Sequence, residues 1–156
     1  ERALVADTAI VSFMPPAARE AWARELERRR LRPDAERQLA AYLHNIGVAH
    51  RAGVKIAVGT DSNVFPQEIM ENLVDAGLTP LDALRAATRN AAEALGVEDR
   101  LGSVREGAVA DLVVVDGDPV ADITHAKRVW GVIKDGRWID RGDLLARARA
   151  RFGSGR

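Results

Sequence analysis

The sequence predicts an α/β protein in which a parallel βα part, up to about residue 97, is followed by a small antiparallel β part. Two observations lead to this prediction. Strand-like apolar segments at 4–13 and 54–59 are separated by long helical stretches, which is the order of a parallel βαβ unit. Beyond residue 98 the helical periodicity gives way to short β segments separated by turn dipeptides.

The first half of the chain contains two strands with a long helical crossover between them. Segment 4–13 reads as a strand, and the Ala-, Arg- and Glu-rich segment 17–30 has the composition of a helix. A further helix begins near Asp34 and ends at Gly53. Its apolar stripe comprises Leu39, Tyr42, Leu43, Ile46, Ala49 and His50. Segment 54–59 lacks alternation apart from one lysine, so we expect a strand that is buried on both faces.

Two more helices follow the second strand. The first is predicted over 67–75 from its apolar stripe. The start of the second is marked by Thr79 as N-cap, Pro80 at the first helical position and Asp82 as the partner of the cap. We expect it to run as one helix until Gly96 ends it.

The last third of the chain carries the antiparallel β signals. A strand is predicted over 110–115, ended by an Asp-Gly-Asp-Pro turn. Segment 128–140 is typical of a β-hairpin, because Asp135-Gly136 is the dipeptide that a type I′ turn prefers. A short helix is predicted over 144–152, near the C-terminus.

The charge balance and the composition exclude several classes of protein. Lysine plus arginine and aspartate plus glutamate number 23 each, and a formal net charge of zero argues against nucleic acid or an anionic membrane surface as partner. No apolar run approaches the roughly 20 residues of a membrane span. The absence of cysteine excludes disulfides and thiolate metal sites, and we expect a cytoplasmic protein.

Asp61 is the main candidate for chemistry. It comes directly after the strand predicted over 54–59, and catalytic groups in parallel α/β folds lie at the carboxyl ends of strands. Thr60 and Ser62 flank it and could orient its carboxylate, which could bind a cation or accept a proton from water. From its position alone, Asp61 fits equally well as the first residue of an Asx turn into the loop that follows.

The histidines and the tryptophans give weaker signals. His44 and His50 lie about 100° apart on one helix, so they cannot bind one metal ion from the same face. His50 is on the apolar stripe and is interpreted as a packing residue, and His125 is placed in a loop between β elements. The three tryptophans are scattered, which is more typical of core or hairpin residues than of a binding site.

Four blocks of sequence carry a family resemblance. They are AGVKIAVGTDS at 52–62, DAGLTPLDALRAATRNAAEALG at 75–96, LGSVREGAVADLVVVDGDP at 101–119 and VIKDGRWI at 132–139. In this order they resemble the C-terminal third of the metal-dependent amidohydrolase superfamily. They look most similar to its imidazolonepropionase-like and Xaa-Pro dipeptidase branch.

The resemblance implies a fold, a reaction and a role for one residue. The fold is the C-terminal part of a (β/α)8 TIM barrel, with barrel units over 1–97, part of a small β-sandwich over 98–140 and a C-terminal helix and tail over 141–156. The reaction is hydrolysis of C–N bonds in a small-molecule or dipeptide-like substrate. The cofactor is Zn²⁺, as one or two divalent ions, with other divalent metals as alternatives. Asp61 would be both a metal ligand and the general base for the attacking water.

The departures from the family limit what this chain does alone. The resemblance makes VKIAVGTD, at 54–61, the eighth barrel strand. The family's other metal ligands come from earlier strands that this chain lacks, and the histidine that often follows the loop after the eighth strand is absent. We therefore expect a later part of a longer protein, inactive by itself, that pairs with a missing N-terminal part or forms a homo-oligomer. A non-catalytic α/β interaction subunit and a deaminase of the same superfamily stay open as alternatives.

Overall fold

The computed structural model describes residues 34–59 and 65–152, together with seven residues between Ala17 and Arg28. Those seven are helical, in agreement with the helix predicted over 17–30, whereas the strand predicted over 4–13 lies outside the described residues. The chain divides into two compact units, residues 36–138 and residues 1–35 with 139–156. The domain boundaries predicted at residues 97 and 140 stay predictions.

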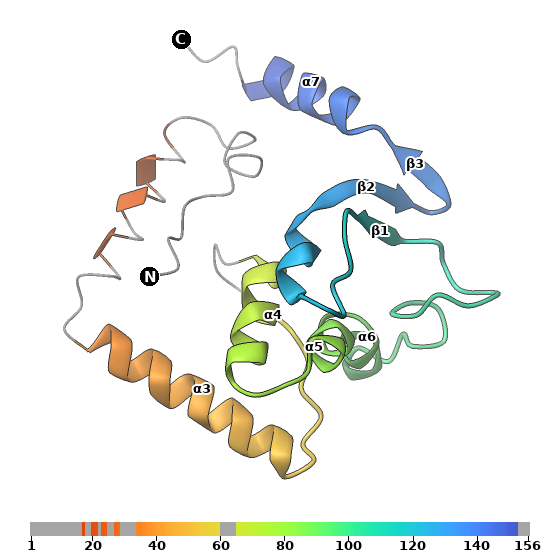
Figure 1. Ribbon diagram of the computed structural model, residues 1–156. Coiled ribbons are helices and arrows are strands. Elements are labelled where there is room, and N and C mark those ends of the chain that lie inside the picture. The colour runs from red at the N-terminus through yellow and green to blue at the C-terminus, as the bar shows by residue number, and fades with distance from the viewer. Residues whose placement is uncertain are drawn as a thin grey trace. The chain divides into compact units, whose positions relative to one another are not determined.

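Helix α3 (Ala35–Arg51) confirms the long helix predicted before the second strand (Figure 1). Its apolar stripe is only partly covered, since Leu39 and Tyr42 are 49% and 47% exposed. The helix contacts the rest of its unit near its C-terminal end. There Gly47 is buried against the Ala76 carbonyl, to which an added Cβ would come within 2.5 Å. Glycine therefore permits the close approach of this helix to the α4–α5 turn.

Segment 54–59 has no regular secondary structure and pairs with no strand among the described residues. Ile56 and Val58 are half-buried, whereas Val54 is 54% exposed, so the segment packs through one face only. The prediction of a strand buried on both faces is therefore wrong for the described part of the chain. A parallel strand acquires its ladder and its second buried face from neighbouring strands, and here the described neighbours are helices.

Helices α4 (Pro66–Asp75) and α5 (Pro80–Ala87) begin as predicted. Each has proline in its first turn, where the missing N–H costs no intrahelical bond. The Thr79 hydroxyl caps α5 by accepting a hydrogen bond from the Asp82 N–H at 3.1 Å. The sequence signal for the start of α5 was therefore sufficient, and α4 starts one residue before the predicted 67.

The single helix predicted from Thr79 to Gly96 is wrong, because a break at Thr88 separates α5 from α6 (Arg89–Ala94). Thr88 leaves the helical region, with φ −127° and ψ −88°. Its hydroxyl donates to the Leu84 carbonyl at 2.7 Å, one turn back. A threonine hydroxyl can in this way compete with the backbone N–H for a helical carbonyl. The apolar periodicity continues through the break, so it gave no sign of it.

The core lies where α4 and α5 meet a short 3₁₀ helix, η1 (Ile123–Lys127). Its members are mostly small or unbranched apolar residues: Met70, Leu73, Leu78, Ala83, Ala86, Ile123 and Ala126. Helix η1 corrects the prediction that His125 lies in a loop. A five-residue element is too short to show a helical period, and the Asp122 side chain starts it by accepting from the Thr124 N–H at 2.9 Å.

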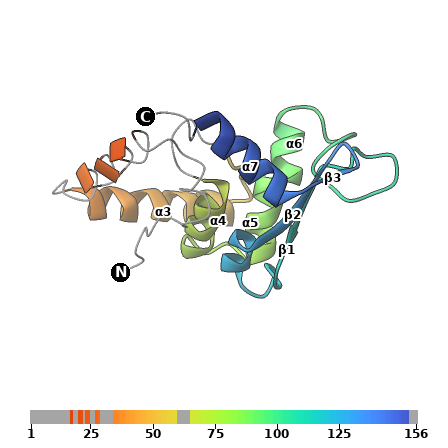
Figure 2. The ribbon, with the colours of Figure 1, turned by 90° about the horizontal axis from the view of Figure 1, so that it is seen from above.

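Three strands form one small sheet in the order β1 (Leu112–Val115), β2 (Val129–Lys134) and β3 (Arg137–Ile139) (Figure 2). Strand β1 pairs with β2 in the antiparallel sense. Asp135 and Gly136 both have positive φ, at 49° and 75°, which confirms the predicted hairpin turn.

A bulge in β2 explains the contact between two tryptophans. The register against β1 shifts between Val114 and Val115, which leaves Trp130 without an opposite residue. A bulge of this kind re-aims the side chain of the extra residue. The rings of Trp130 and Trp138 lie with their centroids 5.0 Å apart, which confirms a hairpin pair.

The C-terminal helix α7 (Arg141–Phe152) belongs to the other unit and starts a few residues before the helix predicted over 144–152. Within the part of the chain that the structure describes, no helix combines the length and the apolar character that crossing a membrane requires.

Gly102 provides a test of the packing around the helix break. Its φ is +85°, and an added Cβ would come within 2.7 Å of the Ala92 Cβ and 2.9 Å of the Thr88 carbonyl oxygen. We expect Gly102→Ala to lower the free energy of unfolding by about 2–5 kcal/mol, because left-handed strain and overpacking add. Urea denaturation measures this loss.

Gly107→Ala is the matched control for that variant. Gly107 has nearly the same φ, +80°, but open space around its Cβ position. We therefore expect it to lose only the backbone contribution of about 1–2 kcal/mol. Equal losses in the two variants would contradict the packing explanation.

Candidate functional site

Asp61, the residue predicted to be catalytic and metal-binding, lies outside the described residues, which stop at Gly59 and resume at Phe65. The structure describes the two segments on either side of it in the chain. One is segment 54–59, and the other is the start of α4.

Two hydrogen bonds attach segment 54–59 to the α5–α6 region. The Val58 N–H donates to the Ala86 carbonyl at 2.8 Å. The Asn90 side-chain amide donates through Nδ2 to the Ile56 carbonyl, also at 2.8 Å and in a part-buried position. Both bonds act on the main chain of the segment, so they hold its path independently of its side chains.

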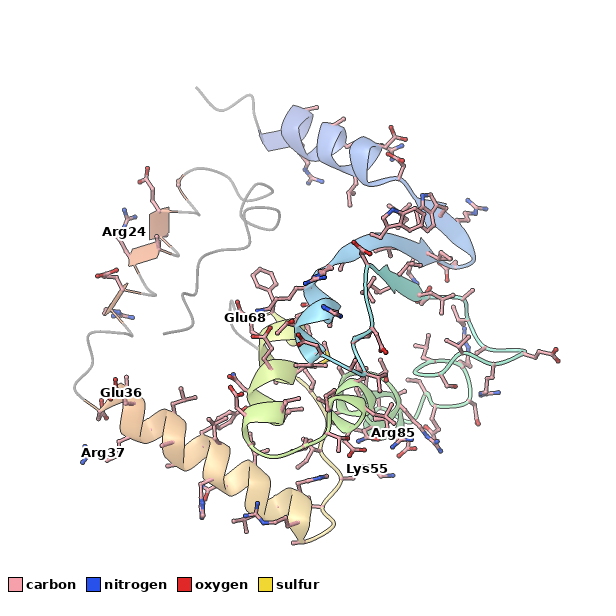
Figure 3. All side chains as sticks on the ribbon, in the orientation of Figure 1. Arg24, Glu36, Arg37, Lys55, Glu68 and Arg85 are labelled. Carbon is pink, nitrogen blue, oxygen red and sulfur yellow. The ribbon has the colours of Figure 1, made fainter. Side chains whose placement is uncertain are left out.

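Lys55, labelled in Figure 3, forms an ion pair with Glu93 in the same region. Glu93 also accepts a hydrogen bond from Arg89 Nε at 3.1 Å. The hydrogen bonds from Lys55 and then from Arg89 hold the pKa of the Glu93 carboxyl below its ordinary value. Because the Lys55 side chain is 64% exposed, the pair contributes little to stability. The position of the segment therefore depends mainly on the two hydrogen bonds made to its main chain, from Asn90 and to Ala86.

The segment on the other side of Asp61 is the start of α4, where the described residues resume at Phe65. Phe65 is the N-cap, with an extended backbone at φ −81° and ψ 145° and no side-chain cap bond. Its carbonyl accepts from the N–H groups of Glu68 and Ile69, at 3.0 and 3.3 Å. The acidic Glu68 in this first turn is favourably placed with respect to the helix dipole.

A charged cluster of Glu68, Glu71 and Lys127 lies where α4 meets η1. Glu71 is 7% exposed, and its Oε1 lies 2.7 Å from Lys127 Nζ. Burial raises the pKa of the Glu68 carboxyl (labelled in Figure 3), while the charge of Lys127 opposes this with a smaller effect. The cluster was not predicted from the sequence, because η1 was not recognised and no spacing motif connects it with α4.

The described histidines have structural positions. His44 is exposed and His50 is half-buried on α3. His125 accepts a hydrogen bond at Nδ1 from the Asp118 N–H at 3.0 Å, and its ring packs against Gly117. His125 thus closes the turn that follows β1.

Within residues 34–59 and 65–152, no group of three histidine, aspartate or glutamate side chains is arranged to hold a metal ion. The described residues therefore do not form a metal site. Asp61 has the hard oxygen donors that a divalent cation binds, so its chemistry suits one ligand of a set. The remaining ligands would have to come from residues outside the described part.

Residues 5–139 of the chain match the sequence model of the amidohydrolase family. Ochratoxinase from Aspergillus niger is 35% identical over 126 residues, which cover 76% of this chain and 24% of that protein. Imidazolonepropionase from Ralstonia nicotianae is 38% identical over 96 residues, which cover 55% of this chain and 24% of that protein.

Solved structures give the same kind of match. A Xaa-Pro dipeptidase with bound methionine superimposes with a TM-score of 0.59 at 36% identity, over 63% of this chain and 25% of that one. Molinate hydrolase superimposes with a TM-score of 0.60 at 31% identity, over 65% and 27%. The chain thus spans about a quarter of the length of the relatives that it matches.

The burial of Glu68 predicts a pH-dependent gain in stability on its neutralisation. Its pKa in the folded state lies above the ordinary 4.5, so ionisation disfavours the folded state as the pH rises through the raised pKa. We expect Glu68→Gln to raise the free energy of unfolding at neutral pH, and the gain should vanish as the pH falls to about 4.

Urea denaturation between neutral pH and about pH 4 measures this difference. The matched control is Glu106→Gln, because Glu106 is exposed and has no burial cost to relieve. A gain at Glu68 that does not depend on pH would contradict the explanation.

Proposed function

The chain belongs to the amidohydrolase family, as its four sequence blocks predicted, and we propose that it is the C-terminal part of a metal-dependent hydrolase that cleaves C–N bonds. The observation that carries this proposal is the match over residues 5–139, combined with coverage of only a quarter of each relative. The barrel units and the β-sandwich portion inferred from the resemblance belong to the same proposal.

In this proposal Asp61 has two roles. Its carboxylate binds a divalent metal, with Zn²⁺ as the first choice, and accepts the proton of the attacking water before passing it to the leaving amine. When bound, such a metal supplies a water with a pKa lowered toward about 7 and polarises the scissile carbonyl. The described residues act by holding the segments that precede and follow Asp61 in the chain.

The substrate class follows from the relatives and stays broad. Their names include an ochratoxinase, an imidazolonepropionase and a Xaa-Pro dipeptidase. We propose a small-molecule or dipeptide-like substrate with an amide, peptide or cyclic amide bond. We also propose that the chain pairs with the rest of the protein, in the cytoplasm, through the surfaces that α3 and segment 54–59 leave exposed.

Replacement of Asp61 tests its catalytic role. In the complete protein that contains this chain, Asp61→Asn should lower kcat/KM by about 10²–10⁴-fold, because an amide cannot act as a general base. Turnover of a panel of Xaa-Pro dipeptides, N-acyl amino acids and cyclic amides measures the loss. Release of ammonia from an amine substrate instead would identify a deaminase.

Asp99→Asn is the matched control. Asp99 is an exposed carboxylate in the turn after α6 and belongs to neither segment that flanks Asp61. It should leave kcat/KM within about twofold, in the range of substitutions that remove no transition-state contact. A loss in both variants, or in neither, would contradict the assignment of Asp61.

A second prediction concerns the chain by itself. The 156-residue chain with added Zn²⁺ should show no turnover on the same panel, because a catalytic zinc needs about three protein ligands. Turnover that disappears in Asp61→Asn would show instead that the chain is a complete catalyst.

A further inference from the structure

At the break at Thr88, three of the last four carbonyls of α5 have hydrogen-bond partners outside the regular helical pattern. The last carbonyls of a helix lack intrahelical partners and need others. The Leu84 carbonyl accepts from the Thr88 hydroxyl at 2.7 Å, and the Arg85 carbonyl accepts from the Thr88 N–H at 3.2 Å. The next one, Ala86, accepts from the Val58 N–H at 2.8 Å. The helix end is thus closed by segment 54–59.

Asn90 makes the second attachment from the far side of the break. It lies in α6, half-buried, and its Nδ2 donates to the Ile56 carbonyl at 2.8 Å. Ile56 and Val58 are the two residues of the segment whose side chains are half-buried against the core. One bond therefore holds a carbonyl and the other an N–H on neighbouring parts of the same short stretch.

These two bonds differ in whether a substitution can remove them. The bond from Val58 is main chain to main chain, so no substitution at Ala86 removes its acceptor. The bond from Asn90 depends on one side-chain amide group, which is the donor that an aspartate of the same shape lacks. Asn90 is therefore the position where the attachment can be cut without changing the backbone.

We propose that Asn90 is a positioning residue for Asp61, acting through the Ile56 carbonyl on segment 54–59, which precedes Asp61 in the chain. The proposal rests on the proposed function, since it gives Asp61 the chemical role and Asn90 the task of placing it. Asn90 reaches the main chain and not the substrate, so its loss changes the geometry of the catalytic group rather than binding.

The kinetic test uses Asn90→Asp and Asn90→Ala in the complete protein. Aspartate keeps the shape but presents an oxygen to the Ile56 carbonyl, and alanine removes the donor without adding charge. We expect kcat to fall by about 10–100-fold, the effect of misplacing a catalytic group by about 1 Å, with KM within about twofold.

The matched control is Glu93→Gln, which weakens the Lys55 contact between the same two elements but leaves the Ile56 carbonyl bonded. Its kcat should stay within about twofold of the wild type. If Glu93→Gln loses as much kcat as the Asn90 variants, the effect comes from the general cohesion of these elements, and the proposal is overturned.

Combination with Asp61→Asn separates positioning from stability. If Asn90 acts through Asp61, adding Asn90→Ala to Asp61→Asn should cause no further loss of kcat, whereas independent effects would multiply. Multiplying losses would overturn the positioning role. A wild-type rate in Asp61→Asn alone would overturn the proposed function, and with it the role assigned to Asn90.

Hydrogen exchange on the 156-residue chain gives a readout that needs no substrate. In Asn90→Ala, exchange of the amides in 54–59 should rise at least about tenfold, while the amides of α5 keep their protection. Unchanged exchange in 54–59 would overturn the proposal. So would loss of protection throughout the chain, since Asn90 would then serve the fold as a whole.

Discussion

One of the two hydrogen bonds that attach segment 54–59 to the α5–α6 region joins main chain to main chain, from the Val58 N–H to the Ala86 carbonyl. This bond exists because α5 ends at Ala87, so that its last carbonyls point away from the helix without intrahelical partners. A helix that continued through Thr88 would use these carbonyls internally. The position of the segment therefore depends on the interruption of the helix, which leaves the Ala86 carbonyl free to accept from Val58.

Small side chains make that approach possible. Ala83 and Ala86 are both fully buried on the face of α5 that meets the core. A backbone-to-backbone bond of 2.8 Å requires that nothing larger stands between the two main chains. A similar close approach occurs at Gly47, where the absence of a side chain lets α3 contact the Ala76 carbonyl. Close main-chain contacts thus bring segment 54–59 to α5 and bring α3 to the α4–α5 turn.

The elements that could be predicted are those with local signals. Thr79, Pro80 and Asp82 form a cap whose every partner lies within one turn, and Asp135-Gly136 needs only two residues to define its turn. The break at Thr88 and helix η1 could not be predicted. Apolar periodicity continues across the first, and the second is shorter than two helical turns. The burial of 54–59 was overestimated because its pattern anticipates neighbours on both faces, whereas the described chain covers one.

The residues of the candidate site also differ in whether a local sequence feature could identify them. Asp61 could be named from the sequence because a carboxylate at a strand end is a local feature that the family blocks then identify. Asn90 could not, since one asparagine in an alanine-rich helix resembles a surface residue and its partner is a carbonyl far away in the sequence. Periodicity describes where side chains lie and carries no information on which main-chain groups lack partners. The helix break and Asn90 both act through main-chain groups of segment 54–59. Neither could be predicted from hydrophobic periodicity, because periodicity describes side chains only.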